Sequence, residues 1–176
     1  MASSKKKVIV RGTDLSTLAG YLPAQRLLTR PAGTLELLDP SGRILPIALK
    51  AVRYVAYVRD FNLNDTQNPE RLMRKTFLAR PRTEGLWLRL KFHDGEIVEG
   101  LAALDLALMD DALADEGVYL IPPDVRSNTQ RIFVPRTALA EMQILGVITT
   151  PSKTVKKKGT RDEPRLPFPD GDGRSS

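Results

Sequence analysis

A short apolar pattern occurs twice in this chain of 176 residues, and it constrains the fold more than any other feature. The segment Val8 to Tyr21 resembles Leu88 to Leu101, with a glycine at the same place in each. A second match relates Ala48–Val55 to Ala138–Leu145 through the pattern Ala-Leu-x-x-apolar-x-x-apolar, and each copy follows a short strand that opens with Arg-Ile. The chain is therefore predicted to be one small β unit used twice. A unit of roughly 55–65 residues is marginal alone, which favours two units packed together.

Turn signals separate short apolar strands in both copies. Asp39-Pro40-Ser41-Gly42 suits a type I turn between two strands, and Asp94-Gly95 is a strong hairpin signal. Many short strands of this kind are typical of small barrels or sandwiches. We predict a mostly β fold of two tandem small SH3-like or Sm-like β-barrels packed together. The expected boundaries are a disordered basic N-terminus over 1–6, a first barrel over 7–60, a linker over 61–84, a second barrel over 85–148 and a disordered tail over 149–176.

Two segments suggest helices. Asn68-Pro69-Glu70 has the residues of a helix start, namely an N-cap, a proline at the first helical position and an acid in the first turn. It predicts a short linker helix over about 69–75. The segment 104–108 alternates like a strand, whereas a helix over 104–113 is the competing interpretation because Leu104, Leu108 and Ala112 would share one face.

The net charge of +6 is carried by the two ends of the chain. Lys5–Lys7 contribute three charges, and the residues from Pro151 onward contribute three more; residues 8–150 hold 17 basic and 17 acidic side chains. A surface that follows phosphates usually concentrates cations on the folded part. The basic tails, with Lys156–Lys158, leave nucleic acid as a possible partner.

Reactive side chains are scarce. The chain has no cysteine, and its one histidine, His93, precedes a hairpin turn, which is typical of an exposed residue. One histidine without cysteine cannot supply the usual closed zinc site. No pair of groups suggests an acid and a base, so we expect no enzyme activity, no cofactor and no metal. No signal peptide or apolar span of about 18 residues occurs, which favours a cytoplasmic location.

Two charged segments remain as candidates for binding. The segment 86–125 is acidic and is interpreted first as a solvated turn and second as a protein-binding patch; its spacing fits no calcium loop. The linker contains the only basic concentration inside the core. The basic side chains of the linker could bind a phosphate or pair with the acidic segment. The aromatic residues Trp87, Phe92, Tyr119 and Phe133 could stack on bases, but aromatic residues on barrel strands more often pack in the core.

Some of these motifs resemble known families. Leu88-x-Leu90-x-Phe92-x-Asp94-Gly95-x-x-x-x-Gly100 is similar to the first hairpin of Sm-like barrels, although Val134-Pro135-Arg136-Thr137 stands where that family has a polar Arg-Gly turn. Residues 8–148 also resemble an uncharacterised bacterial family with a duplicated arrangement, through Arg80–Trp87 and Ser127–Pro135. The Sm resemblance implies a bent barrel, and the resemblance to the bacterial family says nothing about activity.

A third, partial resemblance is to PilZ-type cyclic dinucleotide receptors. Arg71 to Lys75 matches part of their Arg-x-x-x-Arg run. Asp14 to Gly20 departs from their second motif in both length and position.

We therefore expect a non-catalytic adaptor or regulatory binding module whose barrel edges and inter-barrel groove contact another protein. RNA or DNA binding through the basic tails and the 71–82 arginine cluster is the alternative, and a cyclic dinucleotide receptor is a minor one. The oligomeric state stays open. The candidate binding residues are Arg71, Arg74, Lys75, Arg80, Arg82, Trp87, Arg126, Asn128 and Arg131.

Overall fold

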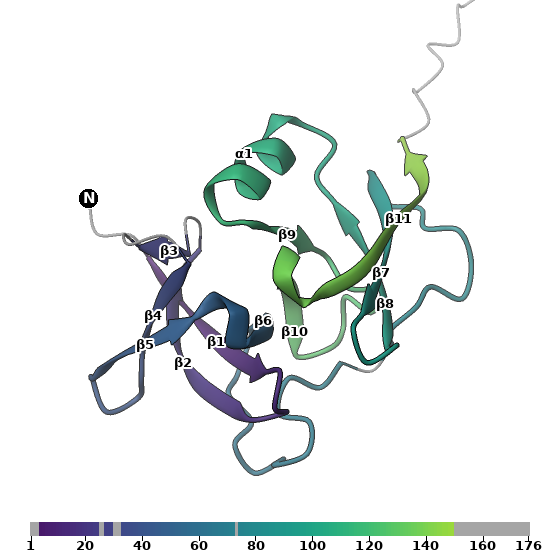
Figure 1. Cartoon of the computed structure of the whole chain (residues 1–176). Coiled ribbons are helices and arrows are strands. Elements are labelled where there is room, and N and C mark those ends of the chain that lie inside the picture. The colour runs from purple at the N-terminus through teal and green to yellow at the C-terminus, as the bar shows by residue number, and fades with distance from the viewer. Residues whose placement is uncertain (1–3, 25–26, 30–32, 73, 150–176) are drawn as a thin grey trace, which may run out of the picture.

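The computed structural model describes residues 4–24, 27–29, 33–72 and 74–149, and they form a mostly β protein. An eight-stranded and a three-stranded antiparallel sheet contain nearly all the regular structure (Figure 1). The first half contains β1 (Lys5–Gly12), β2 (Thr17–Pro23), β3 (Leu28–Thr29), β4 (Thr34–Leu38), β5 (Ile44–Ala48), the 3-10 turn η1 (Leu49–Ala51) and β6 (Val52–Val58). The second contains β7 (Gly85–Phe92), β8 (Ile97–Ala102), α1 (Leu106–Ala114), β9 (Gly117–Leu120), β10 (Thr129–Pro135), η2 (Arg136–Ala138) and β11 (Leu139–Ile148).

The same order of strand pairing occurs in both halves of the chain. Hairpin β1–β2 matches hairpin β7–β8, hairpin β4–β5 matches β9–β10, and the last strand of each half pairs with its first. Gly20 and Gly100 have the same role in both halves. A Cβ at Gly20 would lie 2.6 Å from the Leu38 carbonyl oxygen, and one at Gly100 would lie 2.9 Å from that of Ile121. The glycines therefore permit the close crossing of the next strand.

The octapeptide match predicted from Ala48–Val55 and Ala138–Leu145 is wrong by three residues. Val8 pairs with Tyr57 in the first half, and its equivalent Leu88 pairs with Ile144 in the second. Tyr57 and Ile144 are therefore equivalent, 87 positions apart, whereas the octapeptide match assumed 90. The cause is that alternating apolar residues match at several offsets, while the pairing with the first strand fixes only one.

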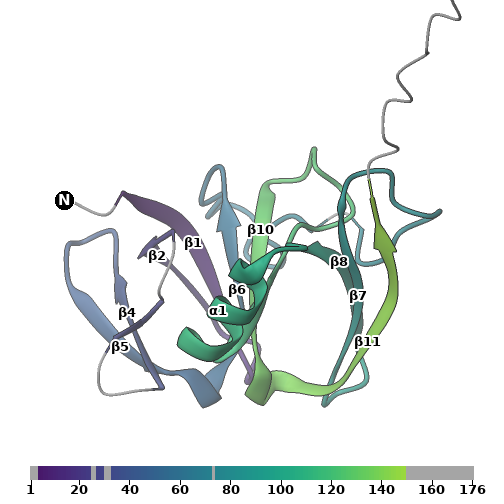
Figure 2. The same ribbon diagram turned by 90° about the horizontal axis from the view of Figure 1, so that it is seen from above.

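Neither half closes into a barrel through strand pairing among the described residues, in contrast to the prediction of two separate barrels. β6 pairs on one side with β1 and on the other with β10 of the second half. The larger sheet therefore runs without a break in the order β3-β4-β2-β1-β6-β10-β9, with β5 on β4, while β11, β7 and β8 form the second sheet. Figure 2 shows β5 and β11 at opposite ends of the molecule.

The two halves share their apolar core. Tyr119 and Phe133 of the second half pack into the core of the first, and their rings are tilted by 50° with centroids 4.9 Å apart. In return, Tyr54 of β6 and Leu72 of the linker pack against the core of the second half. The predicted packing role of Phe92, Tyr119 and Phe133 is confirmed, because each is more than nine-tenths buried.

The linker helix predicted over 69–75 is absent from the described residues, which form turns and bends across 61–84. Arg71 has a positive φ of 44°, which no α-helix permits, and its amide donates to the Asn68 carbonyl to close a single turn. The helix over 104–113, the competing interpretation, is confirmed in outline as α1. No helix in the described part of the chain is long and apolar enough to cross a membrane.

The ends of the chain differ in part from the prediction. Lys5 and Lys6, assigned to a disordered end, belong to β1. The remaining residues of both predicted tails lie outside the described residues, except residues 4 and 149.

Candidate functional site

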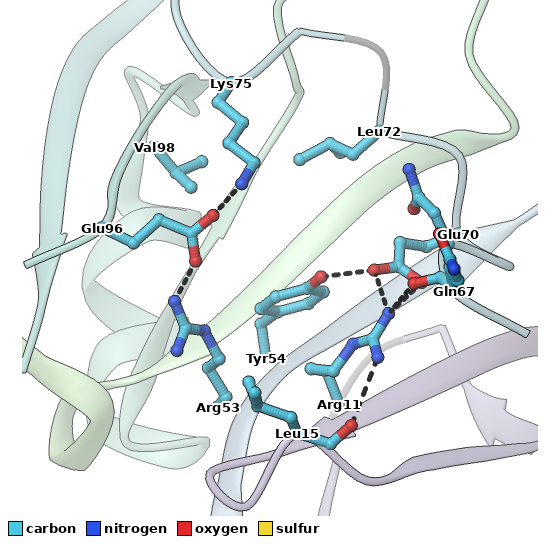
Figure 3. A pocket seen from close by; sticks show the side chains of 11 residues that line it. Arg11, Leu15, Arg53, Tyr54, Gln67, Glu70, Leu72, Lys75, Glu96 and Val98 are labelled. Carbon is cyan, nitrogen blue, oxygen red and sulfur yellow. Dashed lines mark hydrogen bonds and ion pairs between the residues drawn. The ribbon is translucent and has the colours of Figure 1, made fainter. Parts of the chain in front are cut away.

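A cleft of about 350 Å³ lies between the two halves and is lined by β1, β6, β8 and the linker (Figure 3). Its polar side chains form two groups, each built on a carboxylate. One group centres on Glu70 of the linker and the other on Glu96 of the β7–β8 turn.

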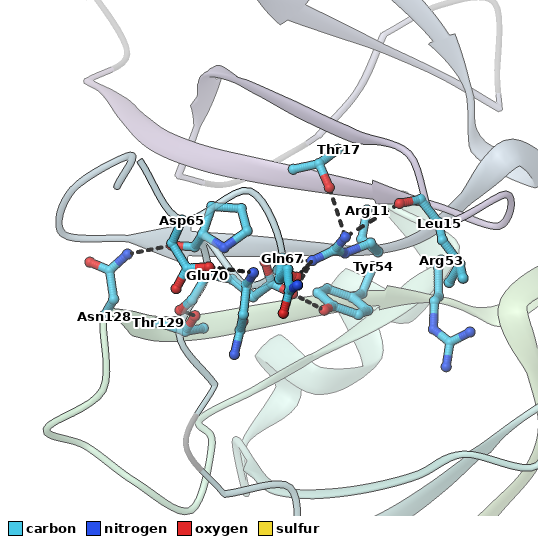
Figure 4. Close-up of polar contacts among 12 residues, drawn as sticks. Arg11, Leu15, Thr17, Arg53, Tyr54, Asp65, Gln67, Glu70, Asn128 and Thr129 are labelled. Carbon is cyan, nitrogen blue, oxygen red and sulfur yellow. Dashed lines mark hydrogen bonds and ion pairs between the residues drawn. The ribbon is translucent and has the colours of Figure 1, made fainter. Parts of the chain in front are cut away.

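Glu70 forms the more buried group (Figure 4). Its Oε1 and Oε2 accept hydrogen bonds from Arg11 Nη2 at 2.6 and 2.8 Å, and Tyr54 OH donates to Oε1 at 2.7 Å. The Glu70 carbonyl also accepts a hydrogen bond from Thr129 Oγ1. Burial and the Glu70 carboxylate raise the pKa of Tyr54, so the phenol stays a donor. Glu70 therefore fixes the linker to β1, β6 and β10.

The second group neutralises the other cations of the cleft. Arg53 pairs with Asp94 and Glu96, and its guanidinium lies 4.5 Å from the centroid of the Phe92 ring. Lys75 pairs with Glu96. The hydrogen bonds from Arg53 lower the pKa of Asp94, with the Glu96 amide adding to the effect. Arg11, Arg53 and Lys75 are thus each matched by a carboxylate, and the cleft offers no excess positive charge from these three residues to an anion.

Another buried carboxylate, Glu99, contacts the rest of the linker. Glu99 of β8 is 2% exposed and accepts hydrogen bonds from Arg89 Nε at 2.9 Å, from Trp87 Nε1 at 3.3 Å and from the Phe77 amide at 3.0 Å. The Glu99 amide in turn donates to the Lys75 carbonyl at 2.6 Å. Phe77 also packs edge-on against Trp87, with 5.9 Å between ring centroids. These contacts hold the linker against β8.

Beyond Phe77 the linker borders a groove of about 330 Å³, which we call the linker groove. Its apolar walls come from the linker, β8 and the segment after β9, and three arginines of the linker line it as well. The apolar residues are Phe77, Leu78, Ala79, Pro81, Leu101, Ile121, Pro122, Pro123 and Val125, and the arginines are Arg74, Arg80 and Arg82. Leu78 and Val125 are well exposed. None of the three arginines forms an ion pair with another described residue.

The other predicted binding residues lie elsewhere. Arg71 and Arg126 line a polar basin near the β6 end, where Arg71 Nη2 donates to Asn62 Oδ1 at 3.2 Å. Asn128 joins segments there, because its Nδ2 donates to the carbonyls of Asp60 and Pro69 and its Oδ1 accepts from the Asp60 amide. Arg131 lies with its guanidinium 3.8 Å from the centroid of the Tyr119 ring.

The predicted cluster over 71–82 is therefore divided among three surfaces. Arg71 is in the polar basin, Lys75 is in the cleft, and Arg74, Arg80 and Arg82 are in the linker groove. The partial PilZ-like pattern is divided in the same way, and Asp14 accepts a hydrogen bond from the Ser16 amide within the β1–β2 turn.

The remaining candidates for chemistry have structural contacts. His93 is exposed, and its Nε2 lies 3.2 Å from the Thr137 carbonyl. Asp115, predicted to lie in a solvated turn, is instead 1% exposed and accepts a hydrogen bond from Tyr119 OH at 2.8 Å. The described part of the chain contains no group of three or more His, Cys, Asp or Glu residues placed to hold a metal ion.

Comparison with known proteins identifies the family. Residues 4–146 match the model of a family of unknown function, DUF6982, and the chain belongs to that family. No curated protein and no solved structure matches the chain significantly.

Proposed function

We propose that this chain is a non-catalytic protein-binding module whose linker groove takes an acidic segment with apolar anchors from a partner. The observation that carries the proposal is the combination of exposed apolar walls with three arginines that lack carboxylate partners among the described residues. In the cleft, by contrast, Glu70 of the linker pairs with Arg11 and Glu96 of the β7–β8 turn pairs with Lys75.

The groove suits this ligand on energetic grounds. Burying one leucine-sized side chain contributes about 1.5–3 kcal/mol, and the walls around Phe77, Ile121 and Pro122 provide an apolar surface for such an anchor. Arginine presents a planar fork of donors that matches a carboxylate in two-point contact. Association and side-chain ordering offset part of this gain, so we expect a dissociation constant on the order of micromolar.

A nucleic-acid ligand is less well supported by the arrangement of charge. Continuous phosphate binding uses cations gathered along one surface, whereas the cations of the 71–82 cluster are divided among three surfaces and Lys75 is paired. The basic tails would still give salt-dependent affinity for phosphate. Binding to nucleic acid is therefore the alternative that the test must distinguish from peptide binding.

The test measures fluorescence anisotropy of a labelled peptide of about 15 residues as the full chain is added. The peptide has leucines spaced three and four residues apart, as on one helix face, with aspartate or glutamate between them. A peptide with lysine in place of each acid is the ligand control, and a single-stranded oligonucleotide of equal length is the competitor. We expect the acidic peptide alone to bind. The proposal is wrong if both peptides bind equally or if only the oligonucleotide binds.

Matched variants locate the contact. The double variant Arg80→Glu, Arg82→Glu reverses two charges in the groove, and Arg43→Glu, Lys50→Glu reverses two exposed charges in the first half. We expect the first to weaken acidic-peptide binding at least tenfold, about 1.4 kcal/mol, and the second to leave it within twofold. Equal effects would place binding elsewhere.

A further inference from the structure

In the described part of the chain, β11 and β5 each have one edge that pairs with no other strand. Within the chain, the last strand of the first half, β6, pairs with β10, and Tyr57 lies opposite Arg131. The equivalent of β6 in the second half is β11, and the equivalent of β10 in the first half is β5. Among the described residues, β11 pairs only with β7 and β5 only with β4.

The side chains on β11 are exposed where those of β6 are buried. Val55 and Tyr57 of β6 are 0% and 5% exposed, whereas their equivalents Met142 and Ile144 are 52% and 64% exposed. β11 is ten residues long, contains one charged residue, Glu141, and has no proline. Native proteins usually shorten, charge or cover such an edge. The repeat indicates which kind of strand covers it, because β10 covers the equivalent strand.

We propose that β11 of one chain pairs with β5 of a second copy and so repeats between molecules the β6–β10 junction within the chain. Transferring the β6–β10 register by the repeat places Ile44 of one copy opposite Ile144 of the other. Ile44 is itself 61% exposed. Two exposed isoleucines would then meet across the new pair, as cross-strand apolar neighbours do in sheets.

The backbone hydrogen bonds of β5 leave its outer edge open for this pairing, although one N–H donor is missing there. The Arg43 carbonyl accepts from the Asp39 amide and the Leu49 amide donates to the Gly33 carbonyl, so both groups point toward β4. Alternation along the strand then turns Ile44, Pro46 and Ala48 toward the open edge. Pro46 has no N–H to donate, while Ile44 and Ala48 keep theirs. The contact between copies is therefore expected to be weaker than the junction within the chain.

The geometry also fixes the kind of assembly. β5 and β11 lie at opposite ends of the molecule (Figure 2), so the two strands of one chain cannot pair with each other. A head-to-tail contact uses two different surfaces and produces either a ring or an open chain of molecules. This contact does not involve the arginines of the linker groove, so it can hold or fail independently of the proposed peptide binding.

Sedimentation velocity with full-length chains tests the proposal. The variants Ile44→Lys and Ile144→Lys each block one edge at an exposed position, and thermal unfolding by circular dichroism checks that both fold like the wild type. We expect the wild type to gain mass with concentration, each variant alone to remain monomeric, and an equimolar mixture to form dimers and nothing larger, because only one pair of intact edges remains.

Three results would overturn the proposal. A wild type that stays monomeric over the full concentration range would show that the edges do not pair. Dimers of Ile44→Lys alone would show that β11 pairs with itself. A mixture that remains monomeric would show that the two edges do not recognise each other.

Discussion

Single carboxylate side chains form hydrogen bonds with residues that are distant from them in the sequence. Glu70 is 59 positions from Arg11, and both of its carboxylate oxygens accept hydrogen bonds from Arg11 Nη2, while Oε1 also accepts one from the Tyr54 hydroxyl. The sequence gives Glu70 only a local role, as an acid in the first turn of a helix. Its actual role depends on partners that become neighbours only after the sheet has formed, which explains why sequence reasoning missed it.

Replacement of Glu70 tests this role. Glu70→Gln keeps the size of the side chain but removes the charge that neutralises the largely buried Arg11, and breaking a buried pair costs about 3–5 kcal/mol. We expect a loss of about 3 kcal/mol in the free energy of unfolding, measured by urea titration. Glu36→Gln on the exposed face of β4 is the control, and its effect should stay within about 0.5 kcal/mol. Equal effects of the two replacements would contradict the role assigned to Glu70.

At the level of strands, local signals predicted much of the fold. The hairpin turns at Asp39–Gly42 and Asp94–Gly95 form where their turn residues place them, because such turns are determined by a few neighbouring residues. The prediction of the linker helix was wrong because contacts distant in sequence decide the path of this segment. The residues Asn68 to Glu70 match a helix start, but the hydrogen bonds of Glu70 and Asn128 hold the chain in an irregular path. The exact offset of the repeat was also inaccessible, since apolar alternation alone does not fix register.

The glycine shared by the two copies provides a test at this level. In Gly100→Ala the new Cβ would lie 2.8 Å from Leu120 Cβ and 2.9 Å from the Ile121 carbonyl oxygen, so β8 and the segment after β9 would have to separate. We expect a loss of about 1–3 kcal/mol in unfolding free energy. Gly146→Ala on β11 is the matched control, because its Cβ would meet only Trp87 at 4.0 Å. A larger effect at Gly146 would contradict the close crossing at Gly100.

At the level of the whole molecule, the repeated strand pairing accounts for both the shared core and the strand edges left open among the described residues. The β6–β10 junction joins the two halves into one sheet, and the linker is held against both halves by Glu70 and Glu99. The sequence shows that residues 8–150 carry no net charge, but it does not show where each charged side chain lies on the folded surface. Folding separates the arginines of one short segment, so Lys75 is neutralised by Glu96 while Arg74, Arg80 and Arg82 line an apolar groove. The groove also requires Leu101 and Ile121, which are distant from the linker in sequence and gave no signal of their own.

The most direct measurement is a titration of the isotope-labelled full chain with the acidic leucine peptide, followed by amide chemical shifts in NMR spectra. We expect saturable shifts concentrated at Phe77, Leu101 and Ile121 of the linker groove, and little change at Tyr54 in the cleft or at Gln143 on β11. Shifts concentrated along β11 or at Lys5–Lys7, with the groove unchanged, would contradict this expectation.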